Sequence, residues 1–589
     1  MGRLPEHRSE TGLSFPRISR PALVLPDNIA FDVVVVGSGY GGSIAASRMA
    51  RAGFRVCLLE RGREIRPGQY PSGLLEAITN TQVDTPSLKH IGSKTALYDL
   101  RINKDIHVFV GCGLGGTSLV NANVALRADP RVFKEPLWPE ELRNDSDQRM
   151  LQAYERAEQM LQPTLYPRSV PKLEALKISA QEFTQGEFFR LPINVTFEAR
   201  QNEAGLFQAA CNDCGNCVSG CNVGAKNTTL MNYLPDAYNH RAEIYTEANV
   251  NYVTRNGDGQ WNVHFETKSK RKKFIHAGIV ILGGGTLGST EILLRSREEG
   301  LRVSSCLGHR FTGNGDFLGI GYNTDFKIQG VALGKHPVIF PKEQRVGPCI
   351  TGAIDLRRGP LGEAMIIEDG AIPAPLGQIG RWLCPFLACF CGRETERSIS
   401  EFYRQVARGC ASAFCGPYTG AMRNTQTYLV MSHDDDGGQM YLENNRLRIA
   451  WPHVGEEWNF KHINQALDVA TKPLGGVYLK EPIWTRDSGL ELITVHPLGG
   501  CIMADCAERG VVNHKGLVFD GTSGPSTYKG LYVCDGSTIP TSLGVNPLLT
   551  ISALAERCCS LIAEDYHRQL NYSREPAAAS RNRTGLSSK

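Results

Sequence analysis

Three glycines spaced for phosphate binding stand near the start of the chain. Gly37, Gly39 and Gly42 form the pattern G-x-G-x-x-G directly after a run of four valines. In this pattern the first glycine permits a tight turn, the second lets the backbone approach a pyrophosphate, and the third lets a helix pack against a strand. Glu60 follows later, where a carboxylate can accept hydrogen bonds from ribose hydroxyls. The spacing predicts a dinucleotide site that includes these four residues and Tyr40.

The residues around these glycines predict a β-strand, an α-helix and a second strand. The β-branched run 33–36 is typical of a strand buried on both faces of a parallel sheet. Residues 43–52 predict the helix, whose first N–H groups would favour a phosphate. Residues 56–59 predict the strand that carries Glu60. This order is that of a Rossmann-like unit.

Three further segments carry glycines and small polar residues that could lie against a planar ring. Residues 111–123 follow a predicted strand at 107–110, and residues 279–285 predict a buried strand that leads into a helix through Arg295. Residues 532–534 predict a third strand, and a helix opens at Pro547 and runs through about Arg557. The first N–H groups of that helix would point at an electron-rich group such as a flavin carbonyl. The candidate cofactor contacts in these segments are Gly111, Gly115, Gly116, Ser118, Asn121, Asn123, Gly285, Asp535, Gly536, Asn546, Pro547 and Leu548.

Length, charge and cysteine content bound the class of protein. The chain has 589 residues and a formal net charge of +4, which gives no sign of nucleic-acid binding. It has no run of 18 apolar residues and no apolar core near its start, so we expect neither a membrane span nor a signal peptide. Most of its 18 cysteines stand in apolar surroundings. We therefore expect an intracellular, cytoplasmic protein.

These segments resemble the glucose–methanol–choline (GMC) family of oxidoreductases, in its cholesterol-oxidase-like branch. GCGLGGTSLVN is similar to the first family signature, GTLGSTEILL is similar to the second, and HPLGGC followed by DGSTIPTSLGVNP resembles the C-terminal region of that branch. The resemblance covers about residues 28–566. It implies non-covalently bound FAD and the oxidation of an alcohol CH–OH group by hydride transfer to flavin N5.

The resemblance also assigns three catalytic residues. His496 stands at the position of the family's active-site histidine, and Asn546 at that of its polar partner. Glu368, in MIIEDGAIPA, falls at the place of the glutamate base. Asp369 departs from the apolar residue expected next to it, and is the alternative base. A base in an apolar pocket would take the hydroxyl proton, and His496 would stabilise negative charge on the substrate oxygen.

The function that we predict is oxidation of a hydrophobic alcohol, sterol-like or another polycyclic or lipid alcohol. The electrons would pass to oxygen or to another acceptor. One alternative is a lyase or isomerase of the same fold that keeps FAD without net redox. Another is a non-catalytic flavin or iron–sulfur relay protein.

A run of four cysteines distinguishes this sequence from those of cholesterol oxidases proper. Cys211, Cys214, Cys217 and Cys221 follow the spacing C-x2-C-x2-C-x3-C, which is that of bacterial ferredoxins, with Asn222 where ferredoxins have proline. Three interpretations compete: an iron–sulfur cluster, a metal-free loop with or without a disulfide, and a structural zinc ion.

We expect an α/β protein of two interleaved domains. The Rossmann-like FAD-binding domain takes residues 28–130, 225–316 and 490–566, and the substrate domain takes 131–224 and 317–489, built on an antiparallel sheet. Residues 1–27 and 567–589 predict mobile tails. The apolar stretch 379–392 is either core or a loop in peripheral contact with a membrane.

Overall fold

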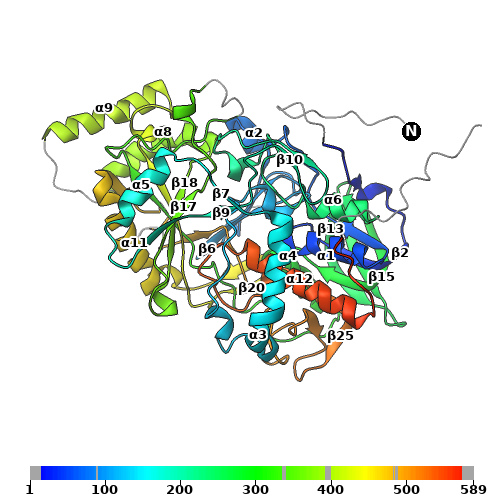
Figure 1. Ribbon diagram of the computed structural model, residues 1–589. Helices are drawn as coiled ribbons and strands as arrows, with labels where there is room; N and C mark the ends of the chain where they lie inside the picture. Colours follow the sequence, from blue (N-terminus) through cyan, green and yellow to red (C-terminus); the bar gives the residue numbers. More distant parts are fainter. Residues whose placement is uncertain are drawn as a thin grey trace, which may run out of the picture.

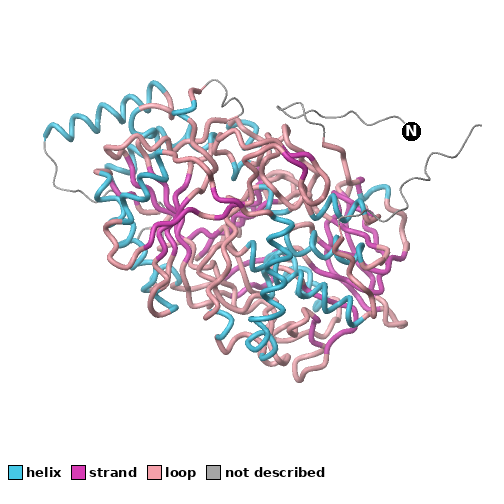
Figure 2. The backbone as a smooth tube through the Cα atoms, in the orientation of Figure 1, coloured by secondary structure: helices cyan, strands magenta, loops and turns pink. Residues whose placement is uncertain are grey.

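The computed structural model describes residues 15–573, except 88–89, 335–339, 392–398, 482 and 485–488. Its strands gather in two main groups on opposite sides of the molecule, with helices and loops between and around them (Figure 2). Residues 15–27 differ from the tail that the sequence predicts. Strand β1 (Arg20–Pro21) extends the larger sheet by pairing with β12 (Glu243–Thr246), and Ala22 and Leu25 are fully buried. The domain boundaries remain a prediction.

The larger sheet has nine strands and contains the Rossmann-like unit. Its parallel core runs in the order β12, β3 (Val56–Leu59), β2 (Ala30–Val36), β15 (Lys272–Leu282) and β25 (Thr527–Val533). Val33, Val34 and Val35 are fully buried, as expected for a strand covered on both faces. Helices α1 (Tyr40–Arg51) and α12 (Leu548–Asp565) pack against each other beside this sheet (Figure 1).

An antiparallel meander extends the same sheet. Strands β13 (Ala248–Arg255) and β14 (Trp261–Thr267) form a hairpin around residues 256–259, where Asn and Gly favour a tight turn, and β14 pairs with β15. Helix α7 (Gly285–Glu298) follows β15, as predicted. Helix α12 runs to Asp565, two turns beyond the predicted end, because residues such as Leu561 and Ile562 continue its buried face.

The second main sheet has six antiparallel strands, as expected for the substrate domain. Its order is β22 (Val477–Leu479), β16 (Phe317–Tyr322), β19 (Gln426–Met431), β18 (Ile366–Gly370), β17 (Gly352–Asp355) and β8 (Glu187–Arg190). Helices α5 (Pro171–Ala180) and α11 (Trp458–Thr471) pack against it (Figure 1).

Shorter elements connect the two sheets. A four-stranded sheet runs β23 (Leu492–Thr494), β6 (Ile106–Gly111), β5 (Tyr98–Arg101) and β4 (Thr81–Asp84). Strand β24 (Leu517–Phe519) pairs with β25, and β20 (Gln439–Glu443) pairs with β21 (Arg446–Ala450). The pairs β7 (Thr164–Leu165) with β9 (Pro192–Ile193) and β10 (Arg200–Gln201) with β11 (Phe207–Gln208) complete the strands. The remaining helices are α2 (Leu74–Thr79), α3 (Glu140–Asp145), α4 (Leu151–Leu161), α6 (Tyr233–Asn239) and α10 (Gly420–Arg423).

The apolar stretch that begins at Ile379 is helical rather than a loop. It lies in α8 (Ala374–Cys391), which packs beside α9 (Ile399–Cys415) at one edge of the molecule (Figure 1). Among the residues described, no helix has both the length and the apolar character that crossing a membrane requires.

Candidate active site

Glycines bring the four predicted cofactor segments into contact. A Cβ atom on Gly37 would lie 2.4 Å from the carbonyl oxygen of Gly283, and one on Gly41 would lie 1.6 Å from that of Cys534. A Cβ on Gly116 would lie 2.8 Å from the Cα atom of Gly39. Side chains at these positions would force the strands, the helix and the loops apart. The close backbone approach explains why residues far apart in the chain can form one site.

The glycine turn itself leaves room for a ligand. A Cβ on Gly39 would meet nothing within 4 Å, so the second glycine of the motif borders open space. The peptide groups beyond it open α1, where the helix dipole favours a phosphate. These features fit the pyrophosphate of a dinucleotide.

Glu60 holds the glycine loop from the end of β3. Its carboxylate accepts hydrogen bonds from the Ser38 hydroxyl at 2.6 Å, the Ser38 N–H at 3.1 Å and the Gly62 N–H at 2.7 Å. Burial raises the pKa of Glu60, and these hydrogen bonds oppose that rise. The Ser38 hydroxyl also accepts from the Gly115 N–H at 2.9 Å, which joins the first segment to the second. Sequence reasoning missed Ser38, although it stands inside the glycine motif.

Two asparagines of the second segment keep polar atoms for a ligand. The Asn121 amide donates to the Tyr40 hydroxyl at 2.9 Å, but its Oδ1 is buried without a hydrogen-bond partner in the described part of the chain. The Oδ1 and Nδ2 atoms of Asn123 are likewise buried without a hydrogen-bond partner in the described part of the chain. Because buried polar atoms are normally hydrogen-bonded, these atoms fit a polar ring such as the isoalloxazine of FAD.

Asp535 ties the third segment to the fourth. Its Oδ2 accepts from the Gly285 N–H at 2.9 Å and the Ser289 hydroxyl, and its Oδ1 accepts from the N–H and hydroxyl of Ser537. Burial raises the pKa of Asp535, and these bonds oppose the rise. The carboxylate is therefore fully used inside the protein, and its role is to hold the two turns together. Gly536, Pro547 and Leu548 lie on the same buried segment.

Glu368 and Asn546 meet at the junction of the two sheets. Glu368 is fully buried on β18, and Asn546 lies two residues before the start of α12. The Asn546 amide donates to Glu368 Oε2 at 3.3 Å, while Glu368 Oε1 and Asn546 Oδ1 lack a hydrogen-bond partner among the residues described. Burial raises the pKa of Glu368 well above its usual value, and the charges of Asp369 and Asp316 add to the rise. The pair thus offers two buried acceptor atoms to a small ligand.

His496 is oriented by an aspartate that sequence reasoning missed. Its Nδ1 lies 2.8 Å from Asp316 Oδ1, so Nδ1 carries the proton that this carboxylate accepts. Asp316 Oδ2 also accepts from the His496 N–H at 3.0 Å and the Thr494 hydroxyl at 2.9 Å. Nε2 lies on the opposite side of the imidazole ring from this carboxylate.

Two further side chains hold the loops that carry these groups. Asn314 accepts from the Leu543 N–H at 2.7 Å and donates to the Val545 carbonyl at 2.9 Å, which positions the residues before Asn546. Asp434 accepts from the N–H groups of residues 313 and 315, at 3.0 and 2.9 Å, directly before Asp316. Burial raises the pKa of Asp434 to about 8, and Asp436 adds to the rise. The glycine-rich segment TGNGD at 312–316 could have drawn attention to Asn314 and Asp316 in the sequence. No spacing rule, however, links this segment to His496.

Asp369 lies on the other side of β18 from Glu368. It forms an ion pair with Lys172 of α5, and both side chains are fully buried. It also accepts from the Thr351 N–H at 2.6 Å, the Gly352 N–H at 2.9 Å and the Thr351 hydroxyl at 2.7 Å. Asp369 is therefore saturated with donors, whereas Glu368 is not.

The four-cysteine run forms a loop that supports the second cofactor segment. Buried Lys226 donates to the carbonyl of Cys217 at 3.0 Å and to that of Asn121 at 2.6 Å. Asn222 exchanges two hydrogen bonds with the backbone of Tyr70, at 2.8 and 3.0 Å. Within the described ranges no three His, Cys, Asp or Glu side chains are placed to hold a metal ion, so the iron–sulfur and zinc hypotheses for Cys211, Cys214, Cys217 and Cys221 are not supported.

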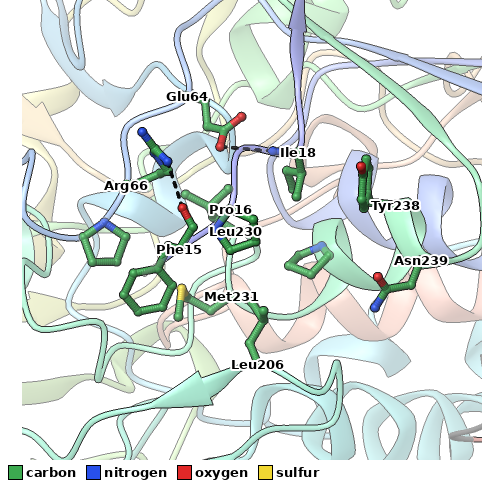
Figure 3. A pocket seen from close by; sticks show the side chains of 12 residues that line it. Phe15, Pro16, Ile18, Glu64, Arg66, Leu206, Leu230, Met231, Tyr238 and Asn239 are labelled. Atoms are coloured by element: carbon green, nitrogen blue, oxygen red, sulfur yellow. Dashed lines mark hydrogen bonds between the residues drawn. The ribbon is translucent and has the colours of Figure 1, made fainter. Parts of the chain in front are cut away.

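A cavity of about 90 Å³ lies away from these groups (Figure 3). Glu64 accepts from the Ile18 N–H at 3.3 Å, and Arg66 donates to the Phe15 carbonyl at 2.8 Å, so this cavity forms where the N-terminal segment docks. Neither His496 nor Glu368 lines it. It is a gap in the docking of that segment rather than the reaction site.

Comparison with known proteins identifies the family. The GMC oxidoreductase family matches residues 31–312 with its N-terminal model and residues 477–555 with its C-terminal model. The chain belongs to the GMC oxidoreductase family. It is an FAD-dependent oxidoreductase that acts on alcohol CH–OH groups, and the resemblance found in its sequence is confirmed.

Several oxidases are similar to the chain over most of its length. A cholesterol oxidase of Acinetobacter baumannii is 28% identical over 574 residues, covering 91% of this chain and 95% of the relative. A cholesterol oxidase of Mycobacterium tuberculosis strain H37Rv is 27% identical over 571 residues, covering 90% and 91%. A long-chain-alcohol oxidase of Arabidopsis thaliana is 25% identical over 568 residues, covering 91% and 68%.

Among solved structures, a formate oxidase variant of Aspergillus oryzae aligns with a TM-score of 0.57. It covers 92% of this chain and 99% of its own at 15% identity. At this identity the likeness concerns the fold alone, and it agrees with the predicted FAD-binding α/β architecture.

Proposed function

We propose that this protein oxidises a hydrophobic alcohol, with Glu368, Asn546 and His496 at the reacting CH–OH group. The observation that carries the proposal is the buried pair of Glu368 and Asn546, which keeps one acceptor atom on each side chain beyond their mutual hydrogen bond. The hydroxyl of a substrate alcohol could donate its hydrogen bond to one of these two acceptor atoms. Because burial raises the pKa of a carboxyl group, the carboxylate that forms on ionisation is a strong base.

The proposed roles follow from the partners of each side chain. Glu368 takes the hydroxyl proton, and its raised pKa matches it to that task. His496, with Nδ1 held by Asp316, supports the substrate oxygen through Nε2 as negative charge develops there. Asn546 orients the alcohol relative to Glu368 or contacts the ring. FAD, held by the glycine loop and by Asn121 and Asn123, would supply the acceptor for the hydride of the carbinol carbon.

The hydrophobic nature of the substrate is proposed from two supports. The relatives named above act, by their names, on cholesterol and on long-chain alcohols. The six-stranded sheet presents buried apolar residues next to Glu368, including Ile366, Ile367 and Met431. The electrons would then pass to oxygen or to another acceptor.

Anaerobic addition of candidate alcohols tests the proposal. A sterol and a long-chain primary alcohol should each be offered to the yellow protein, and the flavin absorbance should bleach with the true substrate class. Glu368→Gln is the matched variant, because it keeps the size and loses the base. Turnover of substrate without any bleaching would favour the lyase or isomerase alternative, and no conversion at all would favour the relay protein.

The predicted contact of Glu60 with the FAD ribose has its own test. Glu60→Arg should abolish cofactor loading, since it replaces an acceptor with a bulky donor and removes the bonds to Ser38 and Gly62. Denaturation of the unmodified protein should release the flavin into the supernatant, as expected for non-covalent binding. Flavin that stays with the denatured chain would contradict this.

The metal content of anaerobically purified protein tests whether the four-cysteine loop binds iron, zinc or no metal. We propose a metal-free cysteine loop, supported by its role in holding Asn121 through Lys226. Iron with acid-labile sulfide would instead indicate a cluster and a dehydrogenase, and one equivalent of zinc would indicate a structural site.

A further inference from the structure

Helix α8 is apolar on both of its sides. Cys384 faces inward and belongs to a buried cluster with Met422 of α10 and Val477 of β22. On the outward side, Leu376, Ile379, Trp382, Leu383 and Phe386 are all exposed, at the spacing of one helical stripe. In a water-soluble protein the outward stripe of such a helix is normally polar. A helix that is apolar all round is found in a protein core or in contact with lipid.

Helix α9 continues this exposed surface. Tyr403, Val406 and Phe414 recur at helical spacing along it, and Tyr403 and Phe414 are 69% and 80% exposed. The ring of Phe414 contacts that of Trp382 edge to face, with the centroids 6.2 Å apart, so the two stripes meet. Figure 1 shows α9 along the outer edge of the molecule beside α8. We call this exposed surface of α8 and α9 the apolar face.

Exposed leucine and isoleucine side chains extend the apolar face onto a third helix. Leu75 and Ile78 of α2 are both exposed, and α2 packs next to α8. A single exposed apolar residue needs no explanation, but a contiguous group on α8 and α9, with further exposed apolar residues on the neighbouring α2, marks an interaction surface.

The charged side chains of the apolar face on α8 and α9 are mainly arginines. Residues 374–388 and 403–415 include Arg381, Arg404 and Arg408, of which Arg408 is ion-paired with Asp325 at 3.1 Å, and the neighbouring α2 carries Glu76. The Arg381 guanidinium lies 5.5 Å from the centre of the Trp382 ring. Apolar and aromatic side chains beside arginines are the composition that binds a bilayer surface containing anionic lipids.

We propose that the apolar face docks the enzyme on an anionic lipid surface. A second copy of the chain fits less well, because a twofold interface would bring the same arginine-bearing patches against each other. The position of the apolar face also suits the proposed oxidation of a hydrophobic alcohol. The purpose that we give to the face rests on that proposed function. Helix α8 follows β18, which carries Glu368, after only a short connection, so the first turn of α8 starts near the strand that carries the proposed base.

Vesicle sedimentation tests the proposal without any turnover. The full-length, FAD-loaded protein should sediment with vesicles of phosphatidylcholine and phosphatidylglycerol, and more weakly with phosphatidylcholine alone. Phe386→Glu combined with Phe414→Glu should weaken the binding by roughly tenfold or more, since two exposed phenyl groups that the bilayer would bury are lost. Arg381→Gln should weaken binding to the anionic vesicles about fivefold.

Val24→Glu is the matched control. Val24 is 59% exposed on the N-terminal segment, compared with 60% for Phe386, and it lies outside the apolar face. This variant should sediment like the unmodified protein. Every variant should keep its flavin absorbance and its rate on a water-soluble alcohol, which shows that it is folded.

Three outcomes would overturn the proposal: no sedimentation of the unmodified protein with anionic vesicles, an equal loss in Val24→Glu, or a dimer in the absence of lipid that Phe414→Glu dissociates. The last result would assign the face to a second copy. Because sedimentation needs no substrate, failure here leaves the proposed alcohol oxidation standing, and failure of the oxidation leaves the docking result readable.

Discussion

Two adjacent carboxyl groups on β18 have opposite surroundings. Glu368 meets the Asn546 amide and has an oxygen without a partner in the described chain, whereas Asp369 is ion-paired with Lys172 and accepts three further hydrogen bonds from residues 351 and 352. Successive residues of a strand point to opposite faces of a sheet, so one step along the chain moves a carboxyl from the Asn546 side to the α5 side. The comparison favours Glu368 over Asp369 as the proposed base, because the fold leaves one oxygen of Glu368 unsatisfied.

The largest expected effect is a difference in turnover between a Glu368 variant and an Asp369 variant. Glu368→Gln should lower turnover by about 10²–10⁴-fold while the flavin stays bound, because the base is lost and the shape is kept. Asp369→Asn should leave the rate per folded molecule near normal. Steady-state kinetics normalised to flavin content compare them. The reverse result would make Asp369 the base, and two normal rates would place the base elsewhere.

The second prediction separates them by stability. Asp369→Asn should lower the free energy of unfolding by about 3–5 kcal/mol, because it leaves the Lys172 ammonium buried without its counter-charge. Glu368→Gln should cost much less, since it removes a buried acid with few donors. Denaturant unfolding measures both changes. The double variant Lys172→Met with Asp369→Leu should recover most of the loss, and if it does not, the ion pair is not the cause.

The third prediction concerns the positioning of His496. Asp316→Asn should lower kcat by about 10²-fold, because the imidazole loses its orientation and its charge partner. The KM for the alcohol should change much less than kcat. Asp434→Asn, which acts one step farther back, serves as the comparison and should cost less. A fall in flavin binding or in stability that accounts for the whole loss of rate would indicate a purely structural role.

The smallest effect is the pH dependence that Glu368 imposes. Its folded-state pKa is raised well above that of the unfolded chain, so kcat/KM should increase as the pH rises through the folded value and the base ionises. Stability should change the other way. The unfolded chain releases this proton first, so unfolding becomes easier as the pH rises from the ordinary glutamate value to the folded one. Glu368→Gln should flatten both trends; profiles identical to those of the unmodified protein would contradict the assignment.

The sequence by itself determined the cofactor segments and much of the fold. The valine run, the three glycines and Glu60 predicted β2, α1 and β3, and the glycine turn at 283–285 predicted that a helix follows β15. These signals are local, since strand periodicity, turn residues and glycine spacing act over a few positions. The resemblance to the GMC family pointed to Glu368, Asn546 and His496 for the same reason, because each lies in a short recognisable string.

Only the tertiary structure decided what those residues meet. Asp316 lies 180 positions before His496, and Lys172 lies 197 before Asp369, so no spacing rule could pair them. The apolar stretch at 379–392 could be core or surface by composition alone, because apolar residues occur in both places. Folding puts α8 at the edge of the molecule, and the outward stripe is exposed because no further layer covers it among the described residues. Long-range packing, which depends on the whole chain, is what turned a set of plausible residues into one arrangement.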